Sequence, residues 1–267
     1  MKRREMLTGL GAGTLLSLGL LDRKTKAADI PSGEIDFWKY AKIDPQKASD
    51  LAYEFYPEGS CMYATVRALL TTVADALQFA NPMAATVVMG FPFHMMRYGH
   101  GGVAAIGSTC GAFNGAAAVI GLFIHDADKR DAMIQELAGY YEQTELPIYK
   151  PKDDMFPSMD SVASESVLCH ISCGRWLAVT GVKISSPRRK DRCRRLTADI
   201  AAKTAELLNR YHADNTCTFA PLTQPTATCV DCHGPQGTQA DASVKMDCAV
   251  CHEHDESHNN QYLNMQK

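Results

Sequence analysis

Apolar residues recur at three- and four-residue intervals through most of the middle of the chain, which places them along one face of a helix. One such stretch follows Ser60, a residue type that often precedes the first turn of a helix. Its apolar positions are Met62, Val66, Leu69, Leu70, Val73 and Leu77. Further helices are predicted to begin at Cys110, to span 126–145 and to run from Ser186 to about His212. The pattern predicts a mainly α-helical fold.

The helical periodicity fades near residue 215, where threonine, proline, glycine and histidine become frequent. We therefore expect a helical four-cysteine domain over 29–215 and a short, irregular segment over 216–267. Near the end of the helical part, Cys169 and Cys173 are four residues apart. If this stretch is helical, both thiols lie on one face, because residues four apart are neighbours on a helix.

The first 28 residues have the pattern of a cleaved signal peptide. A basic start containing Arg3 and Arg4 precedes an apolar stretch, 8–21, that is too short and too rich in glycine to span a membrane. Adjacent arginines indicate the twin-arginine export route, which carries proteins already folded around a cofactor. We therefore expect a signal peptide over 1–28 and a mature protein in the periplasm.

Composition limits the classes of protein to consider. Hydrophobic residues make up 46% of the chain, and no segment after the leader is long and apolar enough to cross a bilayer. The net charge of −3 argues against a general nucleic-acid binder. A basic run over 188–195 could dock haem propionates or an acidic redox partner. Such runs are usually solvated helix faces, and we favour that interpretation.

Two copies of Cys-x-x-Cys-His near the carboxyl end carry the most specific chemistry. In this motif two thiols bond covalently to haem, and the histidine becomes the proximal ligand of the iron. The predicted attachment residues are Cys229, Cys232, Cys248 and Cys251, and the predicted iron ligands are His233 and His252. Paired cysteines can also bind zinc, but zinc does not require a histidine directly after each pair. The motifs therefore predict two haem c groups.

Six cysteines remain outside the haem motifs. Cys61 and Cys110 are each expected in the first turn of a helix, where the helix dipole favours an anionic sulfur. Together with Cys169 and Cys173 they make a four-thiolate set typical of an iron–sulfur cluster. Two disulfides, or thiols that only pack, are the alternatives in an oxidising compartment. We interpret Cys193 as a small buried apolar residue of the last helix.

The CGAxxG motif that begins at Cys110, with Cys61 before it and Cys169 and Cys173 after it, resembles the four-cysteine redox family named for that motif. With the leader and the two haem motifs added, the arrangement resembles the split-Soret family of c-type cytochromes. This resemblance implies a periplasmic homodimer with two closely spaced haems per chain. It also implies two histidines on each iron, a ligand supplied across the dimer interface, and an iron–sulfur cluster on the four cysteines.

The second axial ligands of the haems are not determined by the motifs. The glycine-rich loop before the CGAxxG motif carries two histidines, where simpler four-cysteine proteins have mainly glycine and methionine. We favour His100 and His258, because neighbouring glycines and the chain end, respectively, permit close approach to a haem. The other candidates are His94, His212, Met246 and Met265.

Electron transfer is the function that these features favour. If protein ligands fill both axial positions, no substrate can bind the iron, and the haem can only exchange electrons with redox partner proteins. The alternative is a reductase in which one haem keeps an open position for peroxide, a nitrogen oxide or a metal ion. A haem-based sensor or structural subunit ranks last, because no signalling domain follows the haem motifs. We therefore expect an electron carrier rather than an enzyme.

Overall fold

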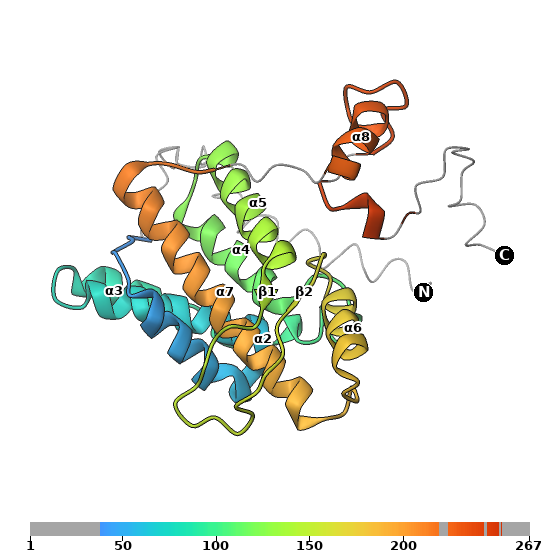
Figure 1. Ribbon diagram of the computed structural model, residues 1–267. Helices are drawn as coiled ribbons and strands as arrows, with labels where there is room; N and C mark the ends of the chain where they lie inside the picture. Colours follow the sequence, from blue (N-terminus) through green and yellow to red (C-terminus); the bar gives the residue numbers. More distant parts are fainter. Residues whose placement is uncertain (1–37, 219–223, 243–244, 251, 253–267) are drawn as a thin grey trace, which may run out of the picture. The chain divides into compact units, whose positions relative to one another are not determined.

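Helices account for most of the computed structural model, which describes residues 38–218, 224–242, 245–250 and 252 (Figure 1). They are α2 (Pro45–Leu77), α3 (Pro82–Met89), the 3-10 helix η1 (Phe93–Gly99), α4 (Gly111–Phe123), α5 (Ala127–Gln143), α6 (Cys169–Thr180), α7 (Pro187–Asp214), α8 (Gln224–His233) and the 3-10 helix η2 (Cys248–Val250). Strands β1 (Glu145–Leu146) and β2 (Val162–Ala163) pair antiparallel. The predicted mainly α-helical fold is confirmed. The predicted signal peptide lies outside the described residues.

Helix ends follow the capping residues in the sequence. The side chain of Ser186 accepts a hydrogen bond from a backbone N–H of α7, and proline occupies the first helical position. That helix ends at Asp214, and Asn215 follows in the left-handed conformation with φ 54°. Asp126 caps α5 in the same way as Ser186 caps α7. The last two predicted helices are therefore confirmed, while the domain boundaries remain predictions.

Helix α2 is interrupted at Ser60. This residue has φ 66° and ψ −166°, and Pro57, which has no N–H to donate, lies one turn before it. Helical geometry resumes immediately afterwards, so Cys61 lies at the start of the second half of α2, as the sequence indicated. The interruption fixes the direction in which the Cys61 thiol enters the core.

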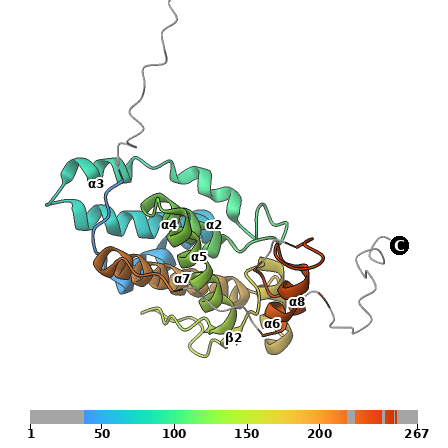
Figure 2. The ribbon, with the colours of Figure 1, turned by 90° about the horizontal axis from the view of Figure 1, so that it is seen from above.

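The core lies where α7 packs along α2 and α4, with α5 against α4 and α7 (Figures 1 and 2). Its fully buried side chains include Leu69, Leu70, Ile120, Leu137 and Ile200, each of which stabilises the fold by about 1.5–3 kcal/mol. Gly115 lets α4 approach α2 closely, because a Cβ there would lie 2.9 Å from the carbonyl oxygen of Met62. Within the part of the chain that the structure describes, no helix is long and apolar enough to cross a membrane.

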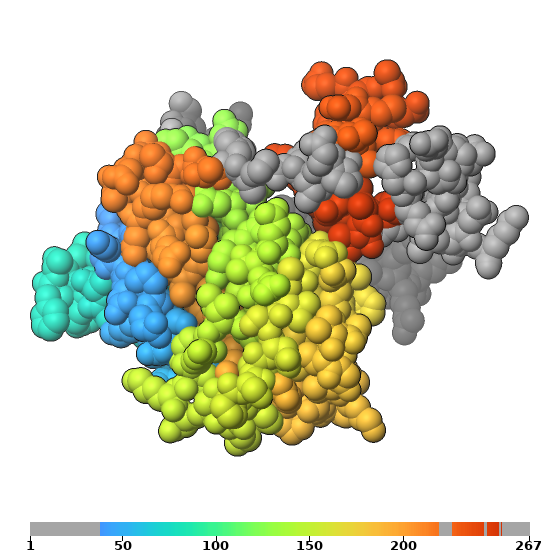
Figure 3. All heavy atoms as spheres, in the orientation of Figure 1, coloured from blue at the N-terminus to red at the C-terminus, as the bar shows by residue number. Residues whose placement is uncertain are grey.

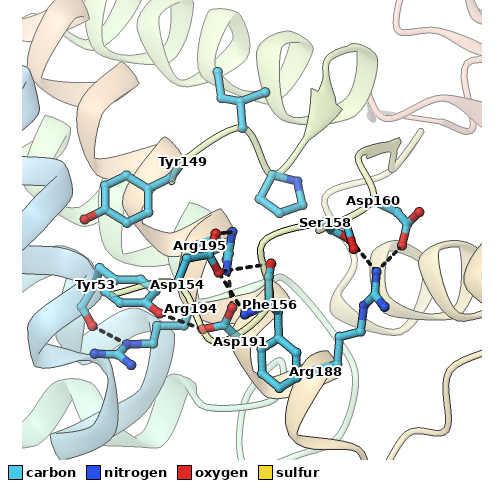
Figure 4. Close-up of polar contacts among 12 residues, drawn as sticks. Tyr53, Tyr149, Asp154, Phe156, Ser158, Asp160, Arg188, Asp191, Arg194 and Arg195 are labelled. Carbon is cyan, nitrogen blue, oxygen red and sulfur yellow. Dashed lines mark hydrogen bonds and ion pairs between the residues drawn. The ribbon is translucent and has the colours of Figure 1, made fainter. Parts of the chain in front are cut away.

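The basic run at the start of α7 is only partly exposed, and the interpretation as a solvated face is wrong for two of its members. Arg192 is 2% exposed and Arg195 is 1% exposed. Arg195 donates to Asp191 at 2.7 Å and also pairs with Asp154, while Arg188 pairs with Asp160 at 2.8 Å (Figure 4). The pairs with Asp154 and Asp160 tie the loop between the two strands to α7.

That loop covers the first half of α7, while α5 lies beside the second half, where Glu136 pairs with Arg210 and the Tyr140 ring lies 5.2 Å from the ammonium of Lys203. In the space-filling view the green to yellow surface of residues 127–163 hides much of the helix, and its orange surface is broad only toward Asp214 (Figure 3). Arg194, also in the basic run, packs against α2, with its guanidinium 3.6 Å from the ring centroid of Tyr53. Distant acids, tyrosines and carbonyls therefore surround the basic run.

Candidate functional site

The first haem motif lies at the end of α8. Cys232 and His233 follow Cys229 by three and four residues, so their side chains lie on the same side of the helix as that of Cys229. Past the helix end the chain turns back, with the Ala242 N–H donating to the His233 carbonyl at 2.8 Å. This turn places Asp241 Oδ1 2.8 Å from Nδ1 of His233. The contact orients the imidazole so that Nε2 is the nitrogen suited to bind iron.

The second haem motif packs against the first. Its beginning forms η2, and the backbone N–H of Cys248 donates to the hydroxyl of Thr226 at 3.1 Å. That hydroxyl in turn donates to Asp247 at 3.0 Å. The thiol of Cys248 lies within hydrogen-bonding reach of Cys229, and burial raises the pKa of Cys248. His252 is described, whereas Cys251 lies outside the described residues. The two attachment motifs are therefore neighbours in space.

Five cysteines from four helices gather in the helical core. Cys61 at the break in α2 hydrogen-bonds with Cys110, the cap of α4, and both are buried. Cys173 on α6 hydrogen-bonds with Cys193 on α7. Cys169, one turn before Cys173, interacts with Cys110 and Cys193. We call these residues the five-cysteine group; it contains two thiol pairs and one further thiol.

The glycines of the preceding loop and of the CGAxxG motif allow this approach. A Cβ on Gly111 would lie 2.6 Å from the sulfur of Cys61 and would overlap the carbonyl oxygen of Gly99. Gly102 has φ +67°, and a Cβ there would lie 2.7 Å from the Cβ of Cys169. Backbone hydrogen bonds, such as the 2.7 Å bond from the Cys169 N–H to Ser108, hold the loop against α6. The glycines are therefore required for contact between sulfur-bearing elements.

Each thiol pair contains one sulfur that ionises readily. The hydrogen bond from Cys61 lowers the pKa of Cys110 to about 7, against the opposing effect of burial. The hydrogen bond from Cys173, followed by the positive charges of Arg192 and Arg189, lowers the pKa of Cys193 to about 5. The pKa values of the donating thiols, Cys61 and Cys173, are raised. Anionic sulfur, the form that binds metal, is thus favoured at both pairs.

Cys193 is a site residue that the sequence interpretation missed. It is half-buried and pairs with Cys173, so its role as a purely apolar residue of α7 is wrong. Its position on the inward stripe of that helix was apparent from the periodicity, but the partner on α6 was not. The available signal was chemical: a cysteine among arginines experiences a positive potential that favours the thiolate.

The arrangement of the thiols distinguishes between kinds of metal site. Among residues 38–252 as far as they are described, no group of three or more His, Cys, Asp or Glu side chains converges closely enough to hold a single metal ion. Two separated thiol pairs suit a polynuclear iron–sulfur cluster, whose thiolate ligands are distributed over several iron atoms. The disulfide alternative would join Cys61 to Cys110 and Cys173 to Cys193, leaving Cys169 reduced.

The candidates for the second axial ligand lie in different surroundings. His100 is exposed at the end of η1, and His94 is exposed within it. His212 stacks on Tyr40 with ring centroids 4.2 Å apart, an arrangement that favours a structural role. His258 lies outside the described residues. The choice of His100 and His258 stays a prediction.

Comparison with known proteins agrees with these features. Residues 63–207 match the family described as "Putative redox-active protein (C_GCAxxG_C_C)". The chain is 32% identical over 282 residues to the split-Soret cytochrome c of Desulfovibrio desulfuricans, with 98% of each chain covered. A solved structure of that cytochrome, described as having a novel iron centre, superposes with a TM-score of 0.73 at 31% identity. It covers 85% of this chain and 95% of that one.

Proposed function

Because this chain belongs to the split-Soret cytochrome c family, we propose that it is a periplasmic electron carrier with two covalently bound haems per chain and an iron–sulfur cluster. Membership of this family establishes that the chain is a cytochrome c with a redox role. The number of haems, the cluster and the location are the proposal. The observation that carries it is the pair of adjacent Cys-x-x-Cys-His motifs, the first with its histidine anchored by Asp241.

Within the haem segment, each side chain has a distinct task. The thiols of Cys229 and Cys232 lie on one side of α8 and would anchor one haem, while His233 presents Nε2 to its iron. The haem would supply a one-electron iron centre. Because the second motif is bound to the first through Thr226 and Asp247, two haems attached here would lie close together. Close spacing would favour rapid electron exchange between them.

The five-cysteine group supports the cluster. It offers more thiols than the four that a cluster requires, since Cys193 lies beside Cys173 and is a further candidate besides Cys61, Cys110, Cys169 and Cys173. Glycines allow the surrounding backbone to lie close to the sulfurs. The relative's novel iron centre is consistent with iron in this region. Insertion of a cluster before export would also explain a twin-arginine leader.

The assembly and its redox partners are part of the same proposal. In keeping with the family resemblance, the chain would form a homodimer in which a histidine of one copy completes the coordination of a haem in the other. Filled axial positions would exclude small ligands from iron. The protein would then exchange electrons with periplasmic redox proteins and would have no substrate of its own.

Composition of the purified protein tests the cofactors. Haem per chain, total iron and acid-labile sulfide are measured on the same sample. We expect two haems, iron in excess of haem iron, and sulfide in amounts that match the excess. Cys193→Ser and Cys173→Ser, compared with each other, show which member of that thiol pair is required for the sulfide signal. Iron equal to haem iron, with no sulfide, would contradict the cluster.

Ligand binding tests the electron-carrier function against the reductase alternative. We expect a low-spin spectrum that carbon monoxide and cyanide leave unchanged, because both axial positions are occupied. A high-spin fraction that binds carbon monoxide would identify an open iron and would favour the reductase. Cell fractionation, with c-type haem staining of the periplasmic extract, tests the location independently.

A further inference from the structure

A guanidinium group is buried beside the five-cysteine group. Arg192 on α7 is 2% exposed, and its Nη2 donates to the hydroxyl of Ser172 at 2.9 Å. Its Nε has no hydrogen-bond partner within the described part of the chain. Arg195, buried one turn later, instead pairs with Asp154 and Asp191. Arg192 is thus a buried cation without a carboxylate ion pair among the described residues.

Sulfur and phenol groups surround this cation. The ionisable groups that act on Arg192 most strongly are Cys193, Tyr141, Cys110 and Cys173. The Arg192 side chain also hydrogen-bonds with Cys193. The hydroxyl of Tyr141 donates to Ser172 at 2.9 Å, so Ser172 links the phenol to the guanidinium.

An acid that interacts with this cation is already occupied by other hydrogen bonds. Asp199, two turns along α7, interacts electrostatically with Arg192. Its two oxygens accept the backbone N–H groups of Ile148 and Tyr149, each at 2.9 Å. Asp199 therefore stabilises the turn after β1 through these two hydrogen bonds. Among the groups that act on Arg192, burial raises the pKa of the Tyr141 phenol, so the sulfur atoms remain as the source of negative charge.

A buried guanidinium without a counter-charge strongly destabilises a fold, because it loses its hydration. Arg192 is tolerated if the sulfur atoms beside it carry negative charge. A cluster held by four thiolates carries such a charge in both of its redox states. Negative charge on the sulfur centre would therefore offset the cost of burying the Arg192 guanidinium.

We propose that Arg192 is a positioning residue that supplies the positive charge beside an anionic sulfur centre and favours the reduced state of the cluster. The proposal rests on the proposed iron–sulfur cluster. Added negative charge on reduction is stabilised by a nearby cation, so the guanidinium raises the midpoint potential. Ser172 and Tyr141 hold the group in place.

Potentiometric titration of the full-length cytochrome tests the electrostatic role. Arg192→Met should lower the equilibrium constant for reduction of the cluster at least tenfold, which is about 59 mV toward negative potential for one electron. The haem potentials should stay unchanged. Arg192→Lys should recover part of the shift. Arg194→Met is the control, since that guanidinium stacks on Tyr53 and hydrogen-bonds with its carbonyl oxygen. A cluster present at wild-type content with unchanged potential would overturn the proposal.

A second measurement needs no cluster. Urea unfolding of reduced, cluster-free protein is compared for Arg192→Met in two backgrounds, wild type and Cys193→Ser. If Arg192 and Cys193 stabilise each other, Arg192→Met should raise the unfolding equilibrium constant at least tenfold more when Cys193 is present. Equal effects in both backgrounds would show simple packing and would overturn the proposal. Absence of sulfide from the wild type would instead refute the proposed function and leave this coupling measurable.

Discussion

Replacing Gly111 with alanine tests whether the glycine of the CGAxxG motif is needed for α4 to approach α2 and η1 closely. The added methyl would meet the sulfur of Cys61 at 2.6 Å and overlap the carbonyl oxygen of Gly99. Real Cβ atoms do not approach other atoms so closely, so α4 must shift away from α2. Overpacking of this kind destabilises a core by about 1–3 kcal/mol, and the rigid backbone oxygen places this case toward the upper end.

Helix propensity opposes part of that loss. Alanine is better than glycine inside a helix by about 0.5–1 kcal/mol, so the net loss for Gly111→Ala is about 2 kcal/mol. The matched control is Gly174→Ala in α6, where a Cβ would meet nothing within 4 Å. That variant should gain about 0.5–1 kcal/mol from propensity alone. The two substitutions are chemically identical and should have opposite effects.

Urea denaturation followed by far-ultraviolet circular dichroism measures both variants. With a slope of about 2 kcal/mol per molar urea, Gly111→Ala should lower the midpoint by roughly 1 M, and Gly174→Ala should raise it slightly. Sulfide content should fall in Gly111→Ala alone, because the shift separates Cys61 from Cys110. Equal midpoints for Gly111→Ala and the wild type would refute the steric argument.

Three further predictions follow from single contacts. Asp241→Asn removes the anionic partner of His233, so the potential of one haem should rise in a redox titration while its haem content stays the same. Burial raises the pKa of Asp199 to about 7, whereas a carboxyl in the unfolded state has a pKa of about 3.9. Between these values the folded state keeps a proton that the unfolded state has lost, so stability should fall as pH rises from about 4 to about 7. Asp199→Asn should flatten this part of the curve of urea midpoint against pH. His100→Ala should produce a high-spin haem fraction by absorption spectroscopy and His94→Ala should not; the reverse result would exchange their predicted roles.

Local signals in the sequence were enough for the helices that begin at a capping residue. Ser186 with its following proline, and Asp126, each start a helix at the expected position. The second half of α2 was recognisable because Ser60 directly precedes a regular pattern of apolar positions. In all of these cases the determining interactions lie within a few residues along the chain, which is why periodicity and capping could reveal them.

Features that depend on distant partners could not be read in this way. Arg195 is buried because Asp154, 41 residues away, neutralises it, and nothing in the basic run indicates that acid. Cys193 joins the sulfur site only because α6 packs beside α7 and brings Cys173 to it. Helix α8 was not predicted, because the haem motif at its end contains few apolar residues to mark a helical face.

The contact between Cys229 and Cys248 has a consequence for maturation of the cytochrome. If the protein is exported to the periplasm, as proposed, both thiols would enter an oxidising compartment before haem is attached, and their proximity would favour a disulfide between them. Such a crosslink would withdraw one thioether-forming sulfur from each motif at once. Maturation would therefore depend on a reductant that keeps these thiols free in the newly exported polypeptide. It would also require haem attachment to proceed faster than reoxidation of the thiols.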